Sequence, residues 1–334
     1  MEPQVTFHTD VSEHSAAVLG WEQTYDQIGS GPLRTTLTQL RGDGYQMFLE
    51  SIDKRVVERG RSPDGLLCIG ISWQGSALGS VNWASENGVG RVGLLRNREP
   101  FELHMPAGAT FLSVNPDFTR FRALALTCLD DIQLRQIDDA SSIDVPVPVV
   151  ARVAERLRDA LHPPSVRDRR DAYSYEANEL ADLAMSGSLE LFGGARHRRS
   201  DRRNSLSVST RLVSCSTELL FDQMVVSVAD LCIQLKVSPR ALQNSFHAVT
   251  GMSPVQYLRG LRLNAVRRRL ATTPPDVLSI GDAAAEMGFY QLSHFARHYR
   301  NLFGELPSNT RRACRSVRIC GSVESSVPIR ANTV

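Results

Sequence analysis

Several classes of protein are excluded by what this 334-residue sequence lacks. Its six cysteines include no CxxC pair and form no dense framework, so a reduced, intracellular protein is the simplest interpretation. No apolar run approaches the ~18–20 residues of a membrane span. The first residues, MEPQVTFHTDVSEH, lack the basic and apolar segments of a secretion signal. We therefore expect a cytoplasmic protein without membrane association.

Catalytic and metal-binding patterns are also missing. The sequence contains neither GxxxxGK[ST] nor GxSxG. Residues 34–128 contain one histidine, His104, whereas zinc or iron needs three or four convergent ligands. His294 and His298 are one helical turn apart, but the glutamate of an HExxH motif is absent. The sequence predicts no enzyme activity, no metal and no cofactor.

Charge is distributed unevenly along the chain. Hydrophobic residues make up 42% and charged residues 22%, which is ordinary for a globular protein, and the net charge is only +2. Residues 196–334 nevertheless carry a formal charge of +11, and residues 1–195 carry −9. The length suits two domains. A basic half joined to an acidic half indicates a polyanionic partner for the basic half.

The N-terminal half has the pattern of a small β-rich domain. Short runs of branched and aromatic residues alternate with glycine-containing turns, which predicts a small barrel or sandwich. We assign an α+β fold with a cupin-like β-barrel at residues 1–145. The predicted strands are Tyr45–Ser51, Leu66–Trp73, Ala77–Trp83, Phe101–Met105, Thr110–Val114 and Phe121–Thr127.

Helices and a linker are predicted to follow. Apolar residues at helical spacing predict helices at 149–161 and 173–191, within a helical segment at 146–192 that either covers the barrel or pairs subunits. The Gly-, Arg- and Ser-rich stretch at 193–209 is typical of a flexible linker. An all-α domain is predicted at 210–313, and the tail at 314–334 is predicted to be disordered.

The last third of the sequence contains an internal repeat. SVAD at 227–230 recurs 52 positions later as SIGD at 279–282, and GMSP at 251–254 recurs as GELP at 304–307. A repeated short helix, turn and second helix is a unit that presents one helix to a partner. The repeat therefore predicts helix-turn-helix units at 227–248 and 278–301, directed at one DNA duplex.

The outward positions of the two second helices are the predicted base-contacting residues. Arginine reads guanine, and asparagine or glutamine reads adenine, through paired hydrogen bonds in the major groove. Ordinary solvation is the competing interpretation for any single residue, but a polar cluster at the exposed end of a capped helix, found twice, favours base reading. The predicted residues are Arg240, Gln243 and Asn244 in the first unit, and Gln291, Ser293 and Arg297 in the second.

A long helix is predicted between the two units, at residues 254–270. It would span ~25 Å at 1.5 Å per residue, a scale suited to holding two helices about one DNA turn, roughly 34 Å, apart. Its arginines cannot all be buried, so some are predicted to contact phosphates. The predicted phosphate contacts are Arg262 and Arg268 in this helix and Arg300 in the second helix-turn-helix unit.

Residues 206–312 resemble the AraC/XylS family of bacterial transcription regulators. The resemblance rests on VSPRALQNSFHAVTGMSP, RLNAVRRRL and GFYQLSHFARHYRNLFG, followed by LPSNTRR. It implies two DNA-reading helices, an N-terminal effector or dimerisation domain, a homodimer, and promoter binding that usually activates RNA polymerase. Family base-contact positions fall on Arg240, Gln243, Asn244, Leu292, Ser293 and Arg297. Thr310 departs from the family pattern, which usually has an aromatic residue there.

A narrower resemblance links GWEQTYDQI and RLNAVRRRL to regulators of ethanolamine-utilisation operons, which implies ethanolamine and cobalamin as effectors. Two other functional hypotheses remain open. One is a cupin-like metabolic enzyme with a helical oligomerisation module, which the scarcity of histidine opposes. The other is binding to nucleic acid without sequence preference, which binding to random duplex would reveal.

Overall fold

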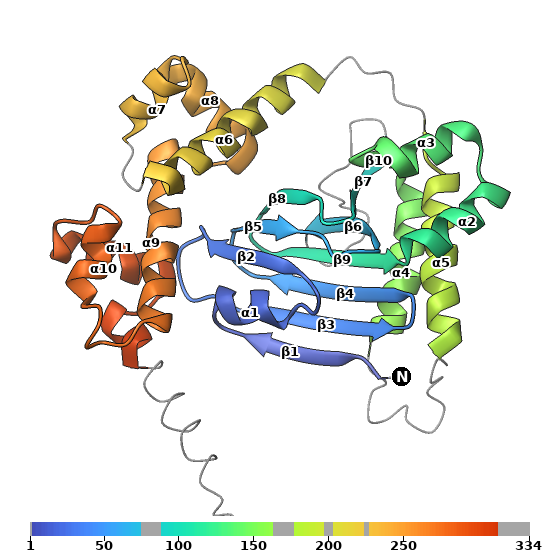
Figure 1. Cartoon of the computed structure of the whole chain (residues 1–334), viewed down its shortest axis with the longest axis horizontal. Helices are drawn as coiled ribbons and strands as arrows, with labels where there is room; N and C mark the ends of the chain where they lie inside the picture. The colour runs from blue at the N-terminus through green and yellow to red at the C-terminus, as the bar shows by residue number, and fades with distance from the viewer. Residues whose placement is uncertain (1, 75–87, 163–176, 197–202, 224–226, 313–334) are drawn as a thin grey trace, which may run out of the picture. The chain divides into compact units, whose positions relative to one another are not determined.

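The computed structural model describes every residue except 1, 75–87, 163–176, 197–202, 224–226 and 313–334 (Figure 1). The described residues divide into two compact units. The first contains residues 2–29 and continues from Leu33 to Arg203, and the second begins at Asn204 and takes in Ser30–Pro32. The predicted helical segment at 146–192 therefore belongs to the N-terminal unit. None of the described helices is both long and apolar enough to span a bilayer.

Two antiparallel sheets form the N-terminal unit. The larger one has the strand order β1-β3-β4-β9-β6-β7-β10, and the smaller one has the order β2-β5-β8. The strands of the larger sheet are β1 (Gln4–His8), β3 (Thr35–Gly42), β4 (Tyr45–Ile52), β6 (Leu67–Gln74), β7 (Val89–Arg96), β9 (Ala109–Pro116) and β10 (Ser142–Pro146). Those of the smaller sheet are β2 (Glu22–Gln27), β5 (Val56–Arg61) and β8 (Pro100–Met105).

The expected closed barrel is not what the described strands form. No strand pairing joins the two sheets within the described part of the chain, and β1 and β10 are the edge strands at opposite ends of the larger sheet. The prediction of a cupin-like barrel is therefore not confirmed. Local sequence signals identify strands and turns, but closure depends on pairing between distant strands, which those signals do not specify.

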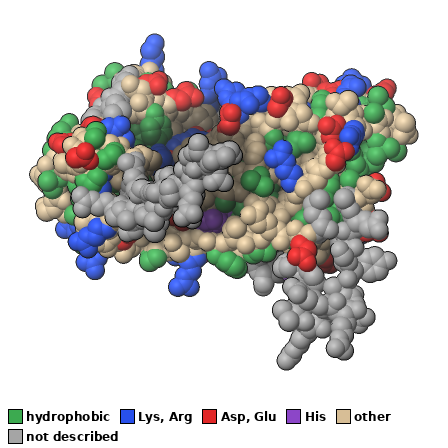
Figure 2. All heavy atoms as spheres, turned by 60° about the horizontal axis from the view of Figure 1, so that its bottom comes forward, with side chains coloured by type: hydrophobic (Ala, Val, Ile, Leu, Met, Phe, Trp, Pro, Cys, Tyr) green, Lys and Arg blue, Asp and Glu red, His purple; other side chains and the backbone are tan. Residues whose placement is uncertain are grey.

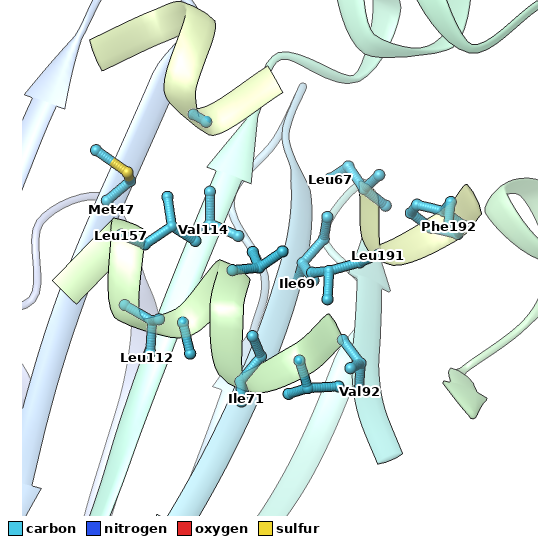
Figure 3. Packing of buried hydrophobic residues seen from close by; sticks show 14 of the residues in the cluster. Met47, Leu67, Ile69, Ile71, Val92, Leu112, Val114, Leu157, Leu191 and Phe192 are labelled. Carbon is cyan, nitrogen blue, oxygen red and sulfur yellow. The ribbon is translucent and has the colours of Figure 1, made fainter. Parts of the chain in front are cut away.

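The main core lies between one face of the larger sheet and the helices α4 (Val147–Leu161) and α5 (Ala177–Gly193). Period-2 alternation on β6 and β9 directs Ile69, Ile71 and Leu112 to this face, where they meet Leu157 and Leu191 (Figure 3). The helices at 146–192 therefore cover the sheet, which is one of the two roles predicted for them. Trp73, near the end of β6, is also part of this core.

Three shorter helices complete the N-terminal unit. Asp10 and Asp130 cap α1 and α3 with side-chain hydrogen bonds to backbone amides, as N-cap residues do. The described helices α1, α2 and α3 span Val11–Ala17, Phe118–Cys128 and Asp131–Asp139.

The strand predicted at Phe121–Thr127 lies within helix α2 instead. Asp117 accepts a hydrogen bond from the amide of Arg120 and so begins the helix. Phe121 and Ala125, four residues apart, then face the core together. Leu124 and Leu126 are exposed, so apolar residues lie on both faces of this helix. The resulting run of apolar residues has the sequence pattern of a strand. The strand predicted at Ala77–Trp83 lies outside the described residues.

The second unit is entirely helical among its described residues outside Ser30–Pro32. Its first helix, α6 (Arg203–Gln223), occupies the second part of the segment predicted to be a flexible linker, so that prediction was wrong for residues 203–209. Ser216 donates a hydrogen bond to Leu212 O within this helix. The helices that follow are α7 (Val228–Gln234), α8 (Pro239–Thr250), α9 (Pro254–Thr272), α10 (Ile280–Glu286) and α11 (Leu292–Phe303).

Candidate nucleic-acid interface

The first helix-turn-helix unit consists of α7 and α8, and serine caps start both helices. The Ser227 hydroxyl accepts a hydrogen bond from the amide of Asp230, and the Asp230 carboxylate accepts one from the amide of Ser227. Ser238 accepts from the amide of Ala241, 3.2 Å away, and Pro239 takes the first helical position. Gly251, at φ 66°, ends α8.

The second unit repeats this construction in α10 and α11. Ser279 accepts a hydrogen bond from the amide of Asp282, 3.0 Å away, and Gly304 ends α11 at φ 75°. The start of α11 differs from that of α8, because its N-cap residue, Gln291, makes no side-chain capping hydrogen bond. The Gln291 side chain is exposed and remains available to a partner.

The turns of the two units have the same backbone shape with different residues. Lys236 has φ 53° in the first unit, and Gly288, 52 positions later, has φ 78° in the second. Only glycine adopts this left-handed region without steric cost. The repeat is therefore one of backbone geometry as well as of sequence.

Helix α9 contributes to the core of both units. Near its start, Tyr257 packs edge-on against Phe246 of α8, with ring centroids 5.5 Å apart. Further along, Leu263 and Val266 pack with Phe295 and Tyr299 of α11. Because one 19-residue helix anchors both second helices, it fixes their separation, and its length is about 28 Å at 1.5 Å per residue.

The polar faces of α8 and α11 are exposed. Burial of Leu242 and Phe246 in α8, and of Phe295 and Tyr299 in α11, leaves the opposite face of each helix in solvent. The predicted base-contacting residues Arg240, Gln243, Asn244, Gln291, Ser293 and Arg297 are all exposed.

Two apolar side chains at the start of α11 are exposed as well. Leu292, a position where the resemblance implies base contact, is 52% exposed, and Tyr290 is 75% exposed. Tyr290 is not among the residues predicted from the sequence to contact bases. An apolar side chain here can contact the methyl group of thymine. Because Tyr290 is exposed, we add it to the candidate DNA-contacting residues.

The three predicted phosphate contacts have different environments. Arg300 is exposed, and Arg268 is half-buried. Arg262 is half-buried, and its guanidinium lies over the Phe289 ring at 5.8 Å from the centroid. Burial and then the charge of Arg259 lower the pKa of Arg262. Arg300 is therefore the best placed of the three to meet a phosphate.

Positive charge is concentrated where α9 meets α11. The pKa of His298 is lowered, first by burial and then by the charges of Arg259, Arg297 and His294. These neighbours disfavour the protonated form of His298. Figure 2 shows that Lys and Arg side chains are scattered among acidic and apolar ones on the face it draws, so no single basic patch covers that face.

The surroundings of Thr310 explain why a polar residue fits where the resemblance predicts an aromatic one. It is buried, donates a hydrogen bond to Glu305 at 2.7 Å, and lies 2.8 Å from the Tyr299 hydroxyl. Glu305 also accepts from Arg267, whose guanidinium lies over the Phe303 ring. Burial raises the pKa of Tyr299 to about 12, so its hydroxyl stays protonated and can donate. A polar network thus replaces the usual aromatic residue and keeps Arg267 within the protein.

Comparison with known proteins identifies the same segment. Residues 231–313 match the family described as a helix-turn-helix domain. A XylDLEGF operon transcriptional activator of Pseudomonas putida is 39% identical over 90 residues, which cover 27% of this chain and 28% of that protein. The transcriptional activator RhaR of Pectobacterium atrosepticum is 30% identical over 159 residues, covering 44% of this chain and 53% of that protein.

Among solved structures, a transcriptional regulator with an AraC-type DNA-binding domain from Chromobacterium violaceum is 29% identical. The aligned region covers 32% of this chain and 96% of the Chromobacterium violaceum chain, with a TM-score of 0.29. The chain therefore spans only about a quarter to a half of the length of the two curated relatives named here.

Proposed function

We propose that the protein is a sequence-specific DNA-binding transcription activator of the AraC/XylS family, whose helices α8 and α11 enter successive major grooves of one duplex. The observation that carries this proposal is that α8 and α11 both have exposed polar faces and are both anchored on the shared helix α9. The transcriptional activators that share the domain support it.

Each side chain has a definite role in this proposal. The Arg240 guanidinium donates two hydrogen bonds to guanine, and the carboxamides of Gln243 and Asn244 pair with adenine. Arg297 stands 53 positions after Asn244, so the second unit reads a different base from the first. Arg300 binds phosphate, and the positive charges around His298 favour the approach of the anionic backbone.

The N-terminal unit is assigned the regulatory role. A small molecule bound there shifts promoter occupancy or contact with RNA polymerase only if it prefers one of two states of the protein. Homodimerisation and recruitment of RNA polymerase belong to the same proposal. Ethanolamine with cobalamin, which the narrower resemblance implies, is the first effector combination to test.

Base reading can be tested on a duplex that the full-length protein selects from a random-sequence library. We expect Arg240→Ala and Arg297→Ala each to lose about 1–3 kcal/mol of discrimination between the selected duplex and one changed at the contacted base. Arg300→Ala is the matched control, because loss of a phosphate contact weakens binding to both duplexes equally.

Three results would contradict the proposal. Unchanged discrimination in both alanine variants would refute the base-contact residues. Equal affinity for selected and random duplexes would indicate a nucleic-acid-binding protein without sequence preference. Stoichiometric iron or zinc in the purified protein, with turnover of a metabolite, would favour the metabolic enzyme.

A further inference from the structure

Two buried glutamates lie between the sheets of the N-terminal unit. Glu50 of β4, in the larger sheet, has 0% of its side chain exposed, and Glu58 of β5, in the smaller sheet, is 4% exposed. Tyr25 of β2 links them, because its hydroxyl donates to Glu50 Oε2 at 2.9 Å and is also hydrogen-bonded to Glu58. Strand pairing places Tyr25 directly opposite Glu58. The two carboxylates therefore belong to one cluster.

Polar atoms of this cluster have no hydrogen-bond partner among the described residues. They are Glu50 Oε1, Glu58 Oε2 and both amide atoms of Gln23, and all of them are buried from solvent. Gln23 lies two residues before Tyr25 on β2, on the same face of the strand. A buried polar atom left unpaired costs ~1–3 kcal/mol, and more when it is charged, so a ligand that pairs with several of these atoms would gain free energy.

Few basic side chains face the cluster among the described residues. Of the described basic side chains, only His14 is hydrogen-bonded to either carboxylate, at 2.8 Å from Glu50 Oε2. Arg59 follows Glu58, but alternation along β5 directs it to the other face, where it pairs with Asp26. Burial, and then the charge of Glu50, raise the pKa of Glu58 well above its usual range. A cation beside both groups would favour the ionised form of Glu58, whereas an anion would oppose it.

Aromatic rings form the next part of the same interior. Trp21 packs edge-on against Phe48 of the larger sheet and Phe101 of the smaller one, with centroids 5.7 and 5.6 Å apart. Phe111 lies 6.2 Å from Phe48. Phe48 is two residues from Glu50 on β4, so the rings adjoin the carboxylates. Aromatic faces attract ammonium groups and hold apolar carbon.

We propose that the N-terminal unit binds a small organic amine, in its protonated form, between Glu50 and Glu58. The ammonium group donates to Glu50 Oε1 and Glu58 Oε2, and the carboxamide of Gln23 serves a further polar group of the ligand. The rings of Trp21, Phe48 and Phe101 enclose the carbon skeleton. This inference rests on the proposed function, because it names the ligand class of the regulatory unit. An anionic effector is disfavoured, because it would add charge of the same sign to two buried carboxylates.

Three probes of one shape and different charge test this ligand class. They are 2-phenylethylamine, 2-phenylethanol and phenylacetate, with methylamine as a probe small enough to need only the carboxylates. Calorimetric titration into the full-length protein at pH 7.5, without DNA, measures each affinity. We expect the two amines to bind, and the alcohol and the carboxylate to bind at least ~10-fold more weakly than 2-phenylethylamine.

Two matched variants locate the site. Glu58→Gln removes one carboxylate and should weaken amine binding ~10- to 100-fold, as the loss of a hydrogen bond to a charged group does. Glu22→Gln is the control, because Glu22 is on β2 of the same sheet, is 65% exposed and pairs with Arg98 at the surface. It should leave amine affinity unchanged. If Glu58→Gln does not fold, Gln23→Ala provides the second test, with weaker amine binding and an intact melting transition.

Several outcomes would overturn the proposal. They are failure of both amines to bind, preference for phenylacetate, and unchanged amine affinity in folded Glu58→Gln. Because these titrations contain no DNA, they separate the two proposals. A protein that discriminates its selected duplex but binds no amine keeps its proposed function and loses this site. A protein that binds amines but does not discriminate its duplex loses the proposed function.

Discussion

Arginine side chains of the helical unit serve different purposes according to their partners. Arg267 is bound to Glu305 at 2.6 Å and covers Phe303, and Arg269 is bound to Glu286 at 2.9 Å. Arg240 and Arg297 are exposed on the second helices of the two units. Net charge therefore identifies the basic unit, but only the contacts of each arginine separate those that stabilise the fold from those available to DNA.

The network at Thr310 predicts a stability effect at this scale. Thr310→Val keeps the side-chain volume and removes the hydroxyl, which leaves the Tyr299 hydroxyl without the partner it has in this structure. We expect a loss of about 1–3 kcal/mol in the free energy of unfolding, measured by urea denaturation. Asn309→Ala, at an exposed neighbouring position, should change it by less than about 0.5 kcal/mol. Equal effects of the two variants would show that the network does not stabilise the fold.

Glu58 predicts a dependence of stability on pH. Its pKa is raised in the folded protein, so between the unfolded and folded pKa values the folded state binds more protons. The free energy of unfolding contributed by this group therefore falls as pH rises through that window. Without ligand, Glu58→Gln should melt about 2–4 °C higher at pH 7.5, the shift that 1 kcal/mol produces in a domain of this size. Its melting temperature should also vary less with pH.

The pH profile of the wild-type protein is the reference for that experiment. Melting temperatures of wild type and Glu58→Gln should converge as pH falls below the range in which an ordinary glutamate titrates. A variant that melts lower than wild type at pH 7.5 would show that Glu58 stabilises the sheets without a ligand, which contradicts the account of a carboxylate whose ionised form is disfavoured by burial.

At the scale of elements, the turn between the helices of each unit depends on a left-handed residue. Gly288→Ala places a side chain at φ 78° and should cost about 1–2 kcal/mol of unfolding free energy. Lys236→Gly makes the reciprocal change at φ 53° and should be close to neutral, because relief of strain offsets the flexibility gained by the unfolded chain. Equal destabilisation by both variants, measured by thermal unfolding, would argue against equivalent turns.

The helical unit was largely predictable from the sequence, and the reason is local. Caps such as Ser227 and Ser238, the stops Gly251 and Gly304, and apolar stripes at helical spacing each act within a few residues. The same reasoning failed at α2, where Phe121 and Thr127 have high strand propensity but Asp117 starts a helix. The packing of Phe121 in the core of the N-terminal unit outweighs its preference for a strand.

The candidate ligand site could not be predicted from the sequence. Glu50 and Glu58 are eight residues apart on strands of different sheets, and Gln23 and Tyr25 reach them only through the pairing of β2 with β5. No local sequence motif indicates that these residues come together in the folded protein. The positions predicted for base contact, in contrast, lie on single helices, where helical periodicity alone defines the exposed face.

For the whole molecule, the uneven charge has a direct interpretation. The basic C-terminal half carries +11 and the acidic N-terminal half −9, so attraction to DNA is confined to one end of the chain. The acidic half is not attracted to a duplex in this way.

Methylation interference on the selected duplex shows whether one chain contacts two successive major grooves. With full-length wild-type protein, we predict two clusters of interfering guanines about 10 base pairs apart on one face of the duplex. Arg240→Ala should abolish interference in one cluster and Arg297→Ala in the other. A single cluster, or two clusters that both variants weaken equally, would contradict the account.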